Sequence, residues 1–192
     1  MSYPEYAKID EKLYKINTDF RYAIECNKIA QDDTINDYER SLALIYVLFG
    51  DDGIDNPEHY DKLLEQAKKY LLCGEKELND TKEEPDMDYI EDMDYIEASF
   101  MSDYHIDLSN IKMHWWKFNN LINGLSNSDM GNCCVLNRIR NLRNYDVSEI
   151  KDSKERKKII EAKQKVALKK NGKVATEEQQ KSALELYKML NL

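Results

Sequence analysis

The sequence predicts an all-α fold, a compact multi-helix bundle of about seven to eight helices with short loops and one acidic linker. Only six glycines and three prolines occur in 192 residues, too few turn-formers for a many-stranded sheet protein. Apolar residues make up 42% and charged residues 34%, which is the composition of a globular protein. Apolar residues also recur at helical spacing along most of the chain.

Three helices are expected between residues 18 and 74. Thr18 is the expected N-cap of the first helix, and Asn36 or Asp37 that of the second. The third begins at Asn56-Pro57, because the first N–H of a helix has no partner within the helix and proline lacks that N–H. Gly74 follows the end of this helix.

These elements define a domain plan. We expect a flexible N-terminal segment (1–17), a helical domain (18–170) and a C-terminal helix (171–192). Within the domain, two subunits (18–74 and 86–170) are joined by the polar, acidic linker 75–85.

A tandem hexapeptide repeat follows the linker. Asp-Met-Asp-Tyr-Ile-Glu occurs at 86–91 and again at 92–97. A six-residue period fits neither 3.6 nor 7, so the repeat is not a coiled-coil heptad. We interpret it as a local duplication that lengthens the start of one helix, which runs to about Tyr104. Tyr95, Ile96, Ser99 and Phe100 are expected to face inward.

Adjacent tryptophans mark the most aromatic segment, 111–125. Neighbouring helical residues point about 100° apart, so Trp115 and Trp116 cannot both enter one narrow core stripe. One ring is expected in the core and the other near a surface, unless both sides of the helix are covered. Packing in the core and an interface hot spot remain alternative roles. The candidate residues for either role are His114, Trp115, Trp116, Phe118, Tyr95 and Phe100.

A basic helix is expected from Asp152 to Lys170. Its candidate docking face consists of Arg156, Lys157, Lys163 and Lys170. A solvated surface, a nucleic-acid contact and docking onto an acidic partner, including a neighbouring copy, are the alternatives. The net charge of −9 argues against a general nucleic-acid binder.

No catalytic, cofactor-binding or metal-ligating residues are expected, and we predict that the chain is not an enzyme. The sequence has no glycine-rich phosphate loop, no nucleophile elbow and no Cys-x-x-Cys pair. The acidic repeat lacks the Gly and Glu that a calcium loop needs at its sixth and twelfth positions.

Localisation follows from similar arguments. Residues 1–19 do not resemble a signal peptide, and the longest apolar run, 42–49, is far below the ~20 residues that span a bilayer. The four cysteines are expected to be reduced thiols. We therefore expect a soluble, cytoplasmic protein.

Several strings in the sequence match one known family. These are Thr18-Asp19-Phe20-Arg21, Cys73-Gly74, 95–100, 104–108, His114-Trp115-Trp116-Lys117-Phe118, Gly124-Leu125, and Ile150-Lys151-Asp152 followed by Arg156. The string 114–118 is the most specific, since two adjacent Trp after a His are rare by chance. They resemble the bacteriophage gene-product-fifteen family of tailed phages and prophages of Gram-positive bacteria. The resemblance covers roughly 14–170, although His105 stands where the family usually has Gly.

The resemblance implies a gene in the tail-morphogenesis block beside the tape-measure gene. It therefore implies a tail assembly chaperone whose partner is the tape-measure protein or another tail protein. A structural tail protein of the virion and an effector that binds a host protein are the alternatives. Homo-oligomers are compatible with all three functions.

Overall fold

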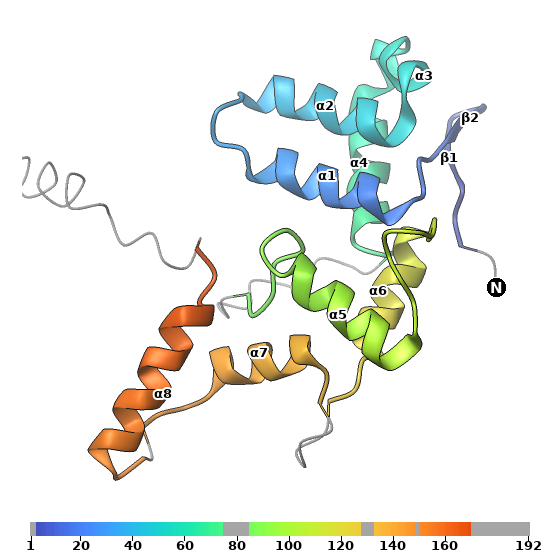
Figure 1. Cartoon of the computed structure of the whole chain (residues 1–192). Coiled ribbons are helices and arrows are strands. Elements are labelled where there is room, and N and C mark those ends of the chain that lie inside the picture. The colour runs from blue at the N-terminus through green and yellow to red at the C-terminus, as the bar shows by residue number, and fades with distance from the viewer. Residues whose placement is uncertain (1–2, 75–84, 128–132, 149, 170–192) are drawn as a thin grey trace, which may run out of the picture. The chain divides into compact units, whose positions relative to one another are not determined.

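The computed structural model describes residues 3–74, 85–127, 133–148 and 150–169 (Figure 1). The predicted helical fold class is confirmed, and a small two-stranded hairpin accompanies the helices. The elements are β1 (Tyr6–Ile9), β2 (Lys12–Lys15), α1 (Phe20–Gln31), α2 (Asp37–Phe49), α3 (Asp51–Ile54), the 3-10 turn η1 (Pro57–His59), α4 (Tyr60–Leu71), α5 (Met93–Tyr104), α6 (Trp115–Asn123), α7 (Val135–Asn144) and α8 (Ser153–Val166).

The hairpin corrects the expected flexible segment 1–17. Strands β1 and β2 pair antiparallel, with Ala7 opposite Tyr14 and Ile9 opposite Lys12. Ala7, Ile9 and Tyr14 lie on its buried face, so the hairpin is part of the core. Alternating apolar residues are the physical signal for such a strand.

The first two helices begin at or next to the predicted N-caps. Asp19, one residue after the expected Thr18, is the N-cap of α1, and its carboxylate accepts from the Arg21 N–H. Asn36 and Glu39 form a capping box at the start of α2, as the first of the two expected caps requires. The two helices lie side by side (Figure 1).

Helix α5 starts later than predicted. The first copy of the repeat forms a turn in which Asp88 accepts from the N–H groups of Ile90 and Glu91. Only the second copy enters the helix, which ends at Tyr104 as expected. Ile96, Ser99 and Phe100 are buried, whereas Tyr95 is partly exposed.

Two compact units divide the chain at a different place from the predicted linker. Among the described residues, unit 1 holds 3–74, 88–127 and 133–138, and unit 2 holds 85–87, 139–148 and 150–169. The boundary therefore falls inside α7. Linker residues 75–84 and the predicted C-terminal helix 171–192 lie outside the described residues.

Three stacked rings form the centre of unit 1. Phe118 stacks on Phe20 at a centroid distance of 4.4 Å and on Phe100 at 5.3 Å. All three side chains are buried. The stack joins α1, α5 and α6, so residues nearly 100 positions apart in the chain share one core.

Candidate protein-binding site

Two of the family-like strings, 18–21 and 114–118, meet at the starts of α1 and α6. Asp19 and His114 form an isolated antiparallel bridge between the two N-caps. The Trp115 N–H donates to the Thr18 carbonyl at 2.8 Å, and the Phe20 N–H donates to the Met113 carbonyl at 2.9 Å. The bridge therefore holds the N-terminal ends of α1 and α6 together, with their backbones antiparallel.

His114 acts as a helix cap in a defined tautomer. Its Nδ1 accepts from the Trp116 N–H at 3.0 Å, so this nitrogen carries no proton. Its Nε2 lies 3.0 Å from the Pro4 carbonyl, which only accepts, so Nε2 donates. Tyr3 stacks on the imidazole at a centroid distance of 4.9 Å. The ring is neutral in this arrangement and both nitrogens are used.

Both indoles bind the end of α4. The Nε1–H of Trp115 donates to the Leu71 carbonyl at 3.0 Å, and that of Trp116 donates to the Tyr70 carbonyl at 2.9 Å. The last carbonyls of a helix have no partner within the helix. The tryptophan pair therefore supplies a donor to the Leu71 carbonyl and a further donor to the Tyr70 carbonyl, which also accepts from the Cys73 N–H at 3.0 Å.

Gly74 allows this close approach. Its φ of +79° is in the left-handed region, and its N–H donates to the Lys69 carbonyl. A Cβ built there would lie 3.0 Å from the tip of the Trp116 ring. The Cys73-Gly74 string is thus explained by its contact with Trp116.

A pocket of about 320 Å³ adjoins Trp116 in unit 1. Its walls come from the hairpin, from α4 and from Trp116, and its lining residues are Pro4, Tyr6, Ala7, Ile16, Gln66, Lys69, Tyr70 and Trp116. Burial raises the pKa of the Tyr70 hydroxyl, with Cys73 and Cys26 adding to the effect, so Tyr70 stays neutral. An apolar, aromatic pocket with one cation suits an apolar side chain better than a charged metabolite.

Comparison with known proteins decides the family. A model described as "Bacteriophage Gp15 protein" matches residues 3–168. The chain belongs to this family. No curated protein and no solved structure matches it. The matched span includes the hairpin, both bridging N-caps and the pocket at Trp116.

The candidate residues of this Gp15-family chain lie in different environments: some are buried in the core and others are partly exposed. Trp115, Phe118 and Phe100 are buried in the core, with exposures of 2%, 0% and 0%. Trp116 is partly exposed and lines the pocket. Tyr95 is partly exposed and does not line it. His114 positions Trp116 through its N-cap bond.

The hairpin and α4 residues of the pocket are those that the sequence reasoning missed. Tyr6 and Ile16 lie in the segment that was expected to be flexible. Gln66 and Lys69 carry no recognisable motif, and only the fold brings them beside Trp116. The alternation of Ala7 and Ile9 was the one available signal.

The residues of the predicted basic face differ in exposure and in hydrogen bonding. Arg156 and Lys157 are exposed on α8, whereas the Lys163 ammonium donates to the Tyr145 carbonyl at 2.5 Å within unit 2. Lys170 lies outside the described residues. Lys163 also borders a pocket of about 280 Å³ in unit 2. Asp86 lines the same pocket and forms an ion pair with Arg140.

Titratable side chains gather at one place in unit 1. A hydrogen bond of 2.7 Å joins the Tyr14 hydroxyl to His59 Nδ1, and His59 Nε2 lies 3.5 Å from Asp10. Tyr14 is 0% exposed, so no substrate reaches its hydroxyl in this structure. The trio anchors the hairpin to η1.

Within the described residues, no helix is long and apolar enough to span a bilayer. The same residues contain no group of three or more His, Cys, Asp and Glu side chains placed to hold a metal ion.

Proposed function

We propose that this chain is a tail-morphogenesis protein that binds the tape-measure protein as a tail assembly chaperone. The pocket at Trp116 is the observation that carries the proposal. It places the partly exposed Trp116 beside Ala7 and Ile16 at the hairpin and the ring of Tyr70 on α4. Trp115 and Phe118 are buried in the core and both ring nitrogens of His114 are hydrogen-bonded, so Trp116, which lines the pocket, is the aromatic member of the string 114–118 that a partner can reach.

The chemistry of the pocket fits a protein client. Trp and Tyr are over-represented among residues that dominate protein interfaces. A volume of about 320 Å³ accommodates one large apolar side chain with its neighbouring atoms. A chaperone has to release its client, and a single shallow anchor of this kind is compatible with weak, repeated binding along a long helical protein.

Co-expression with the tape-measure protein of the same phage tests the proposal. We expect the client to remain soluble and to co-purify with the chain. A client that stays insoluble, or that is soluble without the chain bound to it, contradicts the proposal.

Two neighbouring positions on α4 provide a matched pair of variants. Gln66→Trp fills the pocket, whereas Glu65→Trp adds the same ring at an exposed position outside it. We expect Q66W to lose the client and E65W to retain it. If both variants retain the client equally, the pocket is not where the client binds.

Mass spectrometry of purified phage particles distinguishes a chaperone from the alternative, a structural tail protein. A chaperone is absent from finished tails. Detection of the chain at a fixed stoichiometry in the virion would favour a structural tail protein instead.

A further inference from the structure

Charge is divided unequally between the two units. Among the described residues, unit 1 carries 22 Asp and Glu against 12 Lys and Arg, and unit 2 carries five against ten. Residues 88–107 of unit 1 contain seven acids and neither lysine nor arginine. Helix α8 of unit 2 contains six bases and two acids.

The described residues of unit 2 bury very little apolar surface. Leu168 is its one buried side chain among the described residues, and α8 buries none of its fourteen residues. On the exposed side of α8, Ile160 lies close to Arg156 and Lys157 and is 36% exposed. A helix that leaves apolar side chains in water gains stability when a partner covers them.

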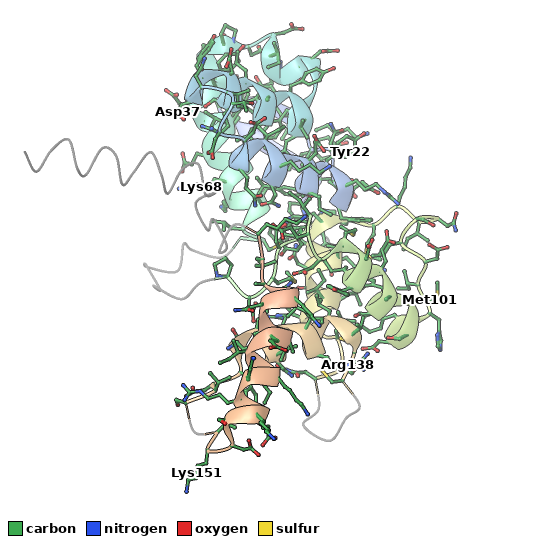
Figure 2. All side chains as sticks on the ribbon, turned by 60° about the vertical axis from the view of Figure 1, so that its left-hand side comes forward. Tyr22, Asp37, Lys68, Met101, Arg138 and Lys151 are labelled. Atoms are coloured by element: carbon green, nitrogen blue, oxygen red, sulfur yellow. The ribbon has the colours of Figure 1, made fainter. Side chains whose placement is uncertain are left out.

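Helix α5 presents the complementary arrangement. Its buried side faces the core of unit 1, and its opposite side exposes Asp94, Glu97, Ala98 and Met101. These residues are spaced three and four apart, so they form one face. Met101, labelled in Figure 2, is 47% exposed. The face therefore has two acids toward its N-terminal end and two apolar residues toward its C-terminal end.

We propose that α8 of one copy of this chain docks onto the exposed face of α5 of a second copy. The two helices are similar in length, about 18 and 21 Å at 1.5 Å per residue. Ile160 packs against Ala98 and Met101, and Arg156 and Lys157 lie against Asp94 and Glu97. The Lys157–Glu161 contact within α8 is long, at 4.0 Å, and exposed, so it competes weakly with this pairing.

The proposal is independent of the proposed function. Each copy carries both faces, so docking is either reciprocal in a dimer or successive in a larger assembly. Sedimentation of the full chain from low to high micromolar concentration should show association at low salt. High salt should dissociate the assembly because it screens exposed charges. A chain that remains monomeric under all these conditions overturns the proposal.

Charge reversal tests which faces meet. We expect Asp94→Lys/Glu97→Lys and Arg156→Glu/Lys157→Glu each to weaken self-association by about tenfold or more, since like charges then face each other. The control matched to the α5 variant is Asp61→Lys/Glu65→Lys on the exposed side of α4, which makes the same change in net charge as Asp94→Lys/Glu97→Lys and should associate like the wild type. An equal loss in the control contradicts the assignment of α5.

Mixing the two charge-reversed variants distinguishes docking between copies from docking within one chain. Each variant alone repels itself, but in the mixture every acidic face again finds a basic face on the other chain. We expect association to return with equal amounts of both variants in the complex. Failure of the mixture to associate overturns the docking between copies, as does a wild-type monomer in which α8 cross-links to its own α5.

Discussion

Hydrogen bonds of two capping side chains lie where the N-terminal ends of α1 and α6 meet in unit 1. Asp19 and His114 each cap one helix, and the bridge between them ties α1 to α6. Asp19 also accepts from the Met113 N–H at 3.2 Å. Each side chain thus satisfies helix N–H groups that have no partner in the helix itself.

Replacement of His114 tests its role as a cap. His114→Ala removes the acceptor for the Trp116 N–H and should lower the free energy of unfolding by about 1–2 kcal/mol. His114→Asn keeps an acceptor at the N-cap and should cost less, although it loses the Pro4 contact. Urea unfolding followed by far-UV circular dichroism measures both. Equal losses would show that the cap bond is not what stabilises this site.

Cysteine reactivity tests the burial of Cys26. Burial, with a smaller contribution from Glu25, raises the pKa of the Cys26 thiol to about 12. The reactive thiolate is therefore scarce at pH 8, and the sulfur is also inaccessible. We expect iodoacetamide to label the partly exposed Cys73 and Cys133 first in the native protein, as peptide mass spectrometry would show. Labelling of Cys26 as fast as Cys73, without urea, would contradict its placement.

At the scale of elements, the end of α4 depends on α6. The two indole donors come from one turn of α6 and reach two successive carbonyls of α4. Separation of the two helices would remove the indole donor from each carbonyl, although the Tyr70 carbonyl would keep the Cys73 N–H. The loss is costly at the buried Trp115 site, where water is excluded.

Tryptophan-to-phenylalanine variants separate the two donors. Trp115→Phe removes a donor and volume from a site that is 2% exposed, and should cost about 2–3 kcal/mol. Trp116→Phe should cost about 1 kcal/mol, because water can reach the partly exposed site. Circular dichroism in urea measures both without relying on tryptophan fluorescence. A larger loss for W116F than for W115F would argue against this assignment.

The hairpin offers a second comparison between neighbours. Tyr14 is buried, packs edge-on against Phe49 and bonds His59, whereas the adjacent Leu13 is 60% exposed. We expect Tyr14→Phe to lower stability by about 1 kcal/mol through the lost hydroxyl bond, and Leu13→Ser to have little effect. Thermal unfolding compares the two. Wild-type stability in Y14F would show that the bond contributes nothing.

At the scale of the whole molecule, the same acidic turn recurs in both units. Asp32, Asp107 and Asp146 each accept from the Ser or Thr two residues later. Hydrogen bonds from Thr34 and Ser109 hold the pKa values of Asp32 and Asp107 below their ordinary value, and Ser148 does the same for Asp146.

These shifts predict a loss of stability in acid. A carboxylate with a lowered folded-state pKa stabilises the protein above its unfolded-state pKa, about 3.9 for Asp, and loses this effect as the pH falls through the folded value. We expect the urea midpoint to change little from pH 7 to 5 and to fall below pH 4. Because Asn cannot ionise, the triple variant Asp32→Asn/Asp107→Asn/Asp146→Asn should show a smaller fall. An unchanged fall would assign it to other carboxylates.

The sequence by itself determined most helices and several of their ends. The Asn36 cap and the end of α5 at Tyr104 followed from residues a few positions apart, because capping and helical periodicity are local. The family resemblance also came from short strings, and the match over 3–168 confirms it.

Only the tertiary structure decided which of these residues meet. The pairing of Asp19 with His114, the indole bonds to α4 and the pocket at Trp116 each join segments more than 40 residues apart. The hairpin likewise depends on burial against the helices, since an isolated two-stranded ribbon is only marginally stable in water. Such contacts depend on how the chain packs as a whole, and local spacing does not encode them.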